Sequence, residues 1–91
     1  MEISNEILAS YAADAALEVA GVAGLVDGRV PGRRSVRIDE RRFELHVALE
    51  WGAPIPEVAR NVQRGVREYL ARMAAFEPAA VDVVVDEVGA A

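Results

Sequence analysis

The sequence contains no cysteine and no lysine, and it has only one histidine and one tryptophan among its 91 residues. Without cysteine, the chain cannot form a disulfide, a thiolate nucleophile, or the ligand set of a zinc finger or an iron–sulfur cluster. All ten of its basic side chains are arginines.

Long hydrophobic runs are also missing. The longest apolar run, residues 19–26, has eight residues including two glycines, whereas a membrane-spanning helix needs about 20. The first six residues carry two acidic groups and no basic group, so they lack the pattern of a signal peptide. We therefore expect a cytoplasmic protein.

The composition is that of an ordinary globular protein. Hydrophobic residues make up 53% of the chain and charged residues 27%, which is not typical of a disordered or low-complexity segment. A chain of this length fits one compact domain with a modest core. We expect a single domain over residues 1–91.

Two stretches have the three- and four-residue apolar spacing of amphipathic helices. The first begins after Ser4, a good N-cap residue, and ends before Gly21. The second begins near Pro56, which suits a first helical turn, and ends before Pro78. Its apolar stripe consists of Val58, Val62, Val66, Tyr69, Leu70 and Met73.

Four further stretches favour β-strands, because three of them alternate apolar and polar residues with a period of two and one is a short apolar run after Gly21. They are residues 22–26, 36–39, 43–51 and 80–88. The second and third are close enough to form a hairpin through Glu40, Arg41 and Arg42. Since the alternation continues to Trp51, we predict that Trp51 is largely shielded from solvent.

These elements predict an α+β fold in the order α-β-β-β-α-β, with a small mixed sheet of about four strands and two helices on one face. The third strand, the second helix and the last strand form a β-α-β crossover, so these two strands should be parallel. The open face of the sheet should then carry mainly polar side chains. They are Arg37, Glu44, His46, Glu50, Asp82 and Asp86.

Several motifs, taken in order, resemble the bacterial alkaline-shock family of envelope-stress-response proteins. The motifs are Ile3-Ser4-Asn5-Glu6-Ile7-Leu8, Gly21-Val22-Ala23-Gly24-Leu25, Pro54-Ile55-Pro56-Glu57-Val58-Ala59 with Val62-Gln63, and Ala80-Val81-Asp82-Val83-Val84-Val85. The resemblance implies a non-enzymatic cytoplasmic protein that a membrane-anchored partner recruits to the inner face of the membrane. It also implies a link to cell-envelope homeostasis and assembly into homo-oligomers.

The most unusual local feature is a cluster of arginines in an otherwise acidic chain of net charge −5. One interpretation is a solvated loop and turn that offset the acidic charge. The other is docking onto an acidic partner segment, an anionic leaflet or nucleic acid, since each arginine near an anionic leaflet gains about 1 kcal/mol. The candidate partner-binding residues are Arg29, Arg33, Arg34, Arg37, Arg41 and Arg42.

Enzymatic chemistry lacks its usual parts. None of Ser4, Ser10 and Ser35 lies in an activating sequence context, and His46 should be an exposed or salt-paired residue of the open face. Carboxylates around His46 could bind a divalent cation, but the spacing of a dedicated metal loop is missing. We expect no catalytic residue, no cofactor, no metal and no small-molecule substrate.

A nucleic-acid-binding domain remains the alternative function. The segment Gly21-Val22-Ala23-Gly24 matches the Gly-x-x-Gly loop of KH domains. However, it has no basic neighbours, it lies between a helix and a strand, and the acidic chain is opposite to the usual electrostatic footprint. The arginine-rich loop alone supports this alternative.

Self-association is a further expectation. Leu17 lies on the polar side of the first helix, and Val84 lies on the polar side of the last strand. Neither has an obvious burial site in a monomer, and no proline blocks the edge strands. Leu17 and Val84 are therefore the candidate self-association residues.

Overall fold

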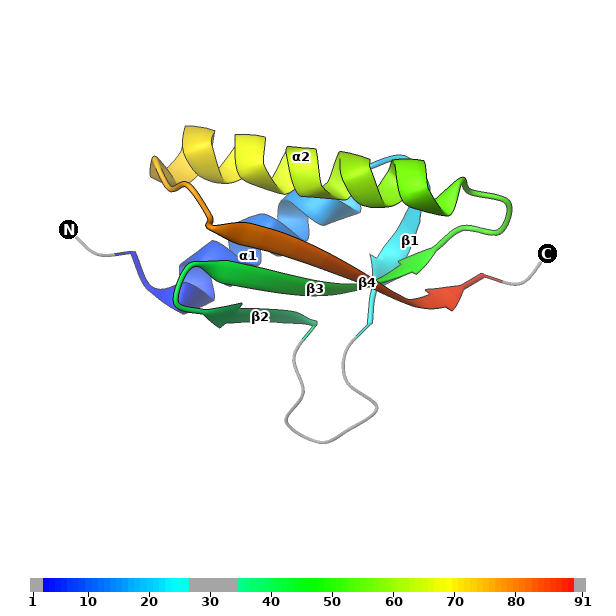
Figure 1. Ribbon diagram of the computed structural model, residues 1–91, viewed down its shortest axis with the longest axis horizontal. Helices are drawn as coiled ribbons and strands as arrows, with labels where there is room; N and C mark the ends of the chain where they lie inside the picture. The colour runs from blue at the N-terminus through cyan, green and yellow to red at the C-terminus, as the bar shows by residue number, and fades with distance from the viewer. Residues whose placement is uncertain (1–2, 27–34, 90–91) are drawn as a thin grey trace.

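A computed structural model describes residues 3–26 and 35–89. Its elements are α1 (Asn5–Leu17), β1 (Val22–Leu25), β2 (Val36–Asp39), β3 (Arg42–Leu49), α2 (Ile55–Ala74) and β4 (Ala80–Val88). The order α-β-β-β-α-β, the mixed sheet and the β-α-β crossover are confirmed (Figure 1).

The N-cap expected for the first helix is present. The Ser4 side chain accepts a hydrogen bond from the Ile7 N–H at 3.3 Å, which satisfies one of the free donors of the first turn. The helix stops before Gly21, whose φ of 94° is left-handed. A Cβ at Gly21 would lie 2.8 Å from Val58 Cγ2, so this turn packs directly against α2.

The sheet is organised around β3. β4 pairs with it in parallel along its whole length, from Arg42 with Ala80 to Leu49 with Val88. β2 pairs antiparallel with the first half of β3, and β1 pairs antiparallel with the second half. Because β4 occupies one edge of β3, β1 and β2 share the other edge and lie end to end along it.

His46 marks the point where these two short strands meet. Its N–H donates to the Ser35 carbonyl at 2.8 Å, and its carbonyl accepts from the Val26 N–H at 2.9 Å. Val26 and Ser35 therefore both lie beside His46, on the same edge of β3.

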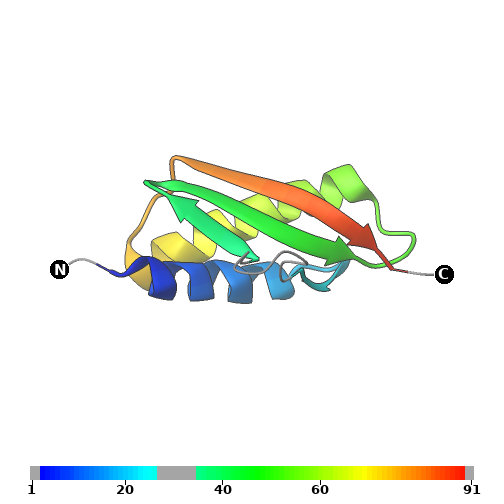
Figure 2. The same ribbon diagram turned by 90° about the horizontal axis from the view of Figure 1, so that it is seen from below.

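Both helices cover one face of the sheet, as Figure 2 shows. The inward side chains of β3 are fully buried there, and those of α2 pack over them. Removing such side chains from water supplies about 1.5–3 kcal/mol each. The largest fully buried residues are Phe43, Leu45, Val47, Leu49, Val62, Val66 and Leu70.

The prediction that Trp51 is shielded is wrong. β3 ends at Leu49, and Trp51 lies in the following turn with 66% of its surface exposed. The Ala53 N–H donates to the Glu50 carbonyl at 3.1 Å, and Gly52 has a φ of 82°. This hydrogen-bonded turn takes the chain out of the strand before Trp51 can face the core.

Candidate binding surfaces

The β2–β3 hairpin carries the described part of the arginine cluster. Asp39 pairs with Arg42, so the turn consists of Glu40 and Arg41, and Glu40 has a left-handed φ of 58°. Arg37, Arg41 and Arg42 are exposed. The other three candidates, Arg29, Arg33 and Arg34, lie outside the described residues.

Arg41 holds the hairpin to the connection between α2 and β4. Its guanidinium donates to the Glu77 carbonyl and lies over the Phe76 ring, 5.1 Å from the centroid. The Arg41 carbonyl in turn accepts from the Ala79 N–H at 2.8 Å. These contacts make Arg41 a structural residue of the hairpin, in addition to any role in binding.

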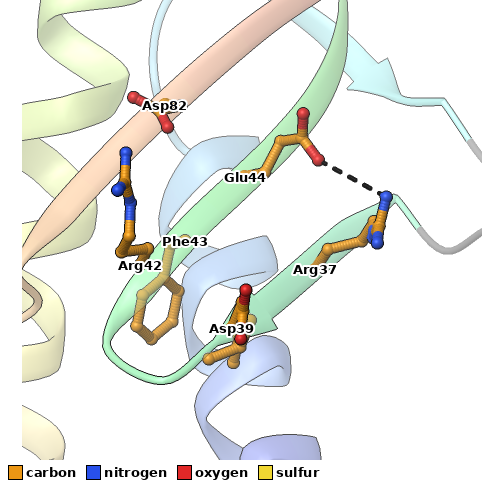
Figure 3. A pocket seen from close by; sticks show the side chains of 7 residues that line it. Arg37, Asp39, Arg42, Phe43, Glu44 and Asp82 are labelled. Carbon is orange, nitrogen blue, oxygen red and sulfur yellow. Dashed lines mark ion pairs between the residues drawn. The ribbon is translucent and has the colours of Figure 1, made fainter.

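Arg37 and Arg42 flank a hollow on the open face of the sheet (Figure 3). The Arg37 guanidinium lies 3.9 Å from the Glu44 carboxylate. An ion pair this exposed contributes at most about 1 kcal/mol. Asp82 of β4 lies opposite Glu44 of β3 in the register of the two strands. The hollow therefore presents two guanidinium groups beside three carboxylates, because Asp39 also lines it, and this mixture suits a polar partner surface.

His46 lies on the open face but is only 2% exposed. Its Nδ1 donates to Asp86 Oδ2 at 2.8 Å, and its Nε2 lies 3.7 Å from Glu44 Oε2. A bulge brings Asp86 into position, because Val47 pairs with Val85 whereas Ala48 pairs with Glu87. Burial with a paired carboxylate makes His46 part of a polar network that fixes β4 on β3.

The structure brings only part of the predicted carboxylate set to His46. Glu44 and Asp86 contact it, whereas Glu50 lies beyond the end of β3. Within residues 3–26 and 35–89, no group of three or more histidine, aspartate and glutamate side chains could hold a metal ion.

The two candidate self-association residues differ in exposure. Leu17, at the end of α1, has 52% of its surface exposed, as expected from its place on the polar side of the helix. Val84 is half-buried on the open face, where it pairs with His46. Leu17 is therefore the more accessible of the two.

A second hollow, which was not predicted from the sequence, lies next to the turn after β3. Its lining includes Trp51, Glu50 and Glu57, together with Gly21 of the α1–β1 turn. The signal that could have found it is Gly52 followed by Pro54, because this spacing predicts a turn and not the last residues of a strand.

A protein-family model for the alkaline shock protein 23 family, with a cell envelope-related function, matches residues 32–90. The chain belongs to this alkaline shock protein family. The expected family is thereby confirmed, and the matched range includes the β2–β3 hairpin, the whole of α2 and β4. Comparison with curated protein sequences gave no match.

Solved structures confirm that this alkaline-shock-family chain has a known fold. A histidine-to-alanine variant of MamM-CTD is 14% identical with a TM-score of 0.56, and the match covers 92% of this chain and 98% of that chain. MamM-CTD 215-293 is 14% identical with a TM-score of 0.55, covering 92% and 99%. A manganese form of a MamM CTD variant is 15% identical with a TM-score of 0.53, covering 92% and 99%.

Neither described helix of this alkaline-shock-family chain is long and apolar enough to cross a membrane. α2 has 20 residues, but charged side chains recur on its outward side, among them Arg60, Arg64 and Glu68.

Proposed function

We propose that this chain is a non-enzymatic binding and scaffold module of the cell-envelope stress response, acting as a single domain. A membrane-anchored protein partner holds it at the inner face of the membrane. The observation that carries the proposal is the match over residues 32–90 to the alkaline shock protein family, which has a cell envelope-related function.

The arginine cluster supports a contact with an anionic surface. Arg37 and Arg42 project from the same hairpin and flank one hollow, so both can reach one partner surface. Attraction to an anionic leaflet gains about 1 kcal/mol per arginine, which is enough for weak recruitment when several act together. In this proposal the protein partner supplies the specific contact and the arginines strengthen it.

Self-association accompanies recruitment in this proposal. The exposed Leu17 side chain and the long outer edge of β4, which pairs only with β3 among the described strands, are surfaces that a second copy could cover. Leu17→Glu should weaken a homo-oligomer, because it places a charge in the contact.

The experiment measures binding of the full chain to inside-out vesicles of the source bacterium's inner membrane. We expect saturable binding that is lost when the vesicles are first treated with protease, because the main contact is a protein. Protein-free vesicles with anionic lipid should bind more weakly and only at low salt. Binding no stronger than that of an unrelated acidic protein would overturn the proposal.

The arginine contribution is tested with charge-matched variants. Arg37→Gln with Arg42→Gln should weaken vesicle binding several-fold, whereas Arg60→Gln with Arg64→Gln on α2 makes the same charge change on the helix layer and should have little effect. A third variant replaces Arg29, Arg33 and Arg34 with serine. If all three variants bind vesicles as well as the unchanged protein does, the arginines only offset the acidic charge. If the two variants in the arginine cluster instead lose binding to single-stranded RNA, the nucleic-acid alternative gains support.

A further inference from the structure

Trp51 is presented to solvent by a fixed turn. The turn is closed by the hydrogen bond from the Ala53 N–H to the Glu50 carbonyl, and Gly52 has the positive φ that a type II turn requires at its third position. Trp51 takes the second position, outside the strand, and is 66% exposed. The backbone is thus already ordered, so a ligand that covers the indole loses little additional chain entropy.

Beside Trp51 is a hollow of about 390 Å³ between this turn, the α1–β1 turn and the first turns of α2. Gly21 keeps the α1–β1 turn close to Val58 of α2 and so forms part of its wall. Among the described residues that line the hollow, only Glu50 and Glu57 are charged, and both are exposed and negative.

Two further apolar side chains are exposed at the same end of the molecule. Ile55, in the first turn of α2, is 42% exposed, and Val88, which pairs with Leu49 at the end of β3, is 44% exposed. Isolated exposed apolar residues are common. A tryptophan exposed beside a hollow is instead typical of a protein-binding surface, where tryptophan often contributes most of the binding energy.

The combination of an indole face and two carboxylates selects a cation. A guanidinium or ammonium group is attracted by the aromatic ring and by carboxylates, and guanidinium also stacks on the ring. We propose that this surface, formed by Trp51, Glu50 and Glu57, binds an arginine or lysine side chain within a basic segment of a protein partner. It is named the Trp51 site below.

The source of that segment rests on the proposed function. Cytoplasmic segments next to membrane-spanning helices carry an excess of lysine and arginine, so a membrane-anchored partner offers a basic segment at the inner face of the membrane. The acidic Trp51 site and the arginines of the hairpin then have separate ligands: the partner's basic segment for the first and an anionic surface for the second.

A second copy of this chain is a poorer ligand for the Trp51 site. Of the three described hairpin arginines, Arg41 already contacts Phe76 and the Glu77 carbonyl, Arg37 lies beside Glu44, and Arg42 flanks the open-face hollow that also contains Asp39 and Asp82. Using Arg41 in a contact between copies would break the contacts that hold the hairpin, and two copies that each have a net charge of −5 repel one another. A partner segment without such contacts has no equivalent loss.

The test uses the full chain and a short capped peptide of alternating arginine and serine, with a glutamate–serine peptide as control. Because Trp51 is the only tryptophan, its fluorescence reports the site directly. We expect a saturable change in Trp51 emission with the arginine peptide, no change with the glutamate peptide, and weaker binding at higher salt.

Variants distinguish peptide binding at the Trp51 site from attraction by the overall negative charge. Glu50→Gln with Glu57→Gln, and Trp51→Ala measured by the anisotropy of a labelled peptide, should each weaken binding about three- to tenfold. The matched control is Glu68→Gln with Glu77→Gln, which removes the same charge from another hollow, at the far end of α2, without a tryptophan. Equal weakening by both glutamate pairs, or an unchanged Trp51→Ala variant, would overturn the proposal.

Three further outcomes are distinguishable. A shift in Trp51 emission on concentrating the protein without peptide would mean that a second copy fills the site, which overturns the assignment to a partner segment. Vesicle binding that persists in Trp51→Ala together with failure of the peptide test refutes the Trp51 site but leaves the proposed function standing. Peptide binding at Trp51 without any vesicle binding refutes the function and leaves the cation site standing.

Discussion

The two ends of β3 carry aromatic residues in opposite environments. Phe43, near the start, is fully buried, lies edge-on to Phe76 with 5.8 Å between the ring centroids, and is part of the core. Trp51, just beyond the end, is two-thirds exposed. Both belong to the same alternating series in the sequence, so alternation identifies the face of a strand but not the residue at which the strand stops.

The difference follows from what lies next to each end. At the first end, the connection between α2 and β4 returns over the hairpin, and Arg41 holds it there through Phe76 and Glu77. At the other end, Gly52 turns the chain away towards α2. The first end is therefore packed for stability, and the second presents an aromatic side chain to solvent.

The largest effect that tests this comparison is expected at Phe43. Phe43→Ala removes a fully buried ring and should lower the free energy of unfolding by about 3–5 kcal/mol, because the cavity can collapse only in part. Urea denaturation followed by circular dichroism measures it. If the variant does not fold, Phe43→Leu should still unfold at clearly lower urea than the unchanged protein; stability equal to that of the unchanged protein would contradict the buried placement.

The sequence predicts the elements well where local signals decide. The apolar stripe of α2, the Ser4 cap and the alternation from Phe43 to Leu49 are local patterns, and each corresponds to an observed element. The candidate arginines were also visible in the sequence. The sequence did not reveal that Arg41 contacts Phe76 and the Glu77 carbonyl and so has a structural role.

Other features depend on contacts between distant segments. The burial of His46 requires the bulge that brings Asp86 to it, which no periodicity in the sequence reveals. β1 and β2 share one edge of β3, and this arrangement likewise depends on pairing that local sequence patterns do not reveal. The Trp51 site was missed because the period of two was continued from Leu49, where β3 ends, to Trp51, directly before Gly52.

The second prediction concerns the two left-handed glycines at the Trp51 end. Gly21→Ala should lower the free energy of unfolding by about 2–3 kcal/mol, because it adds backbone strain and a clash with Val58 Cγ2. Gly52→Ala has the same kind of backbone strain but open space around the added Cβ, so the loss should be about 1–2 kcal/mol. Equal losses in denaturant unfolding would show that the packing of the α1–β1 turn against α2 contributes nothing.

The third prediction distinguishes the structural from the binding arginines of the β2–β3 hairpin. Arg41→Ala should lower the free energy of unfolding by about 1 kcal/mol, since it removes a cation–π contact and a hydrogen bond to the Glu77 carbonyl. Its neighbour Arg42 flanks the open-face hollow, and Arg42→Ala should change stability by no more than about 0.5 kcal/mol. A larger loss for Arg42→Ala than for Arg41→Ala would reverse the assignment of structural and binding arginines.

The smallest effect is expected at Trp51. Trp51→Phe keeps an aromatic side chain on the exposed turn and should change the free energy of unfolding by less than about 0.5 kcal/mol, because little of the indole is buried. In the unchanged protein, the native emission maximum of Trp51 should lie close to that of the unfolded chain, since water surrounds the indole in both states. A strongly blue-shifted native maximum at low protein concentration would mean that the indole is covered within the monomer, and the contrast between the two ends of β3 would fail. A blue shift that grows with protein concentration would instead place a second copy on Trp51 and leave the contrast within the monomer intact.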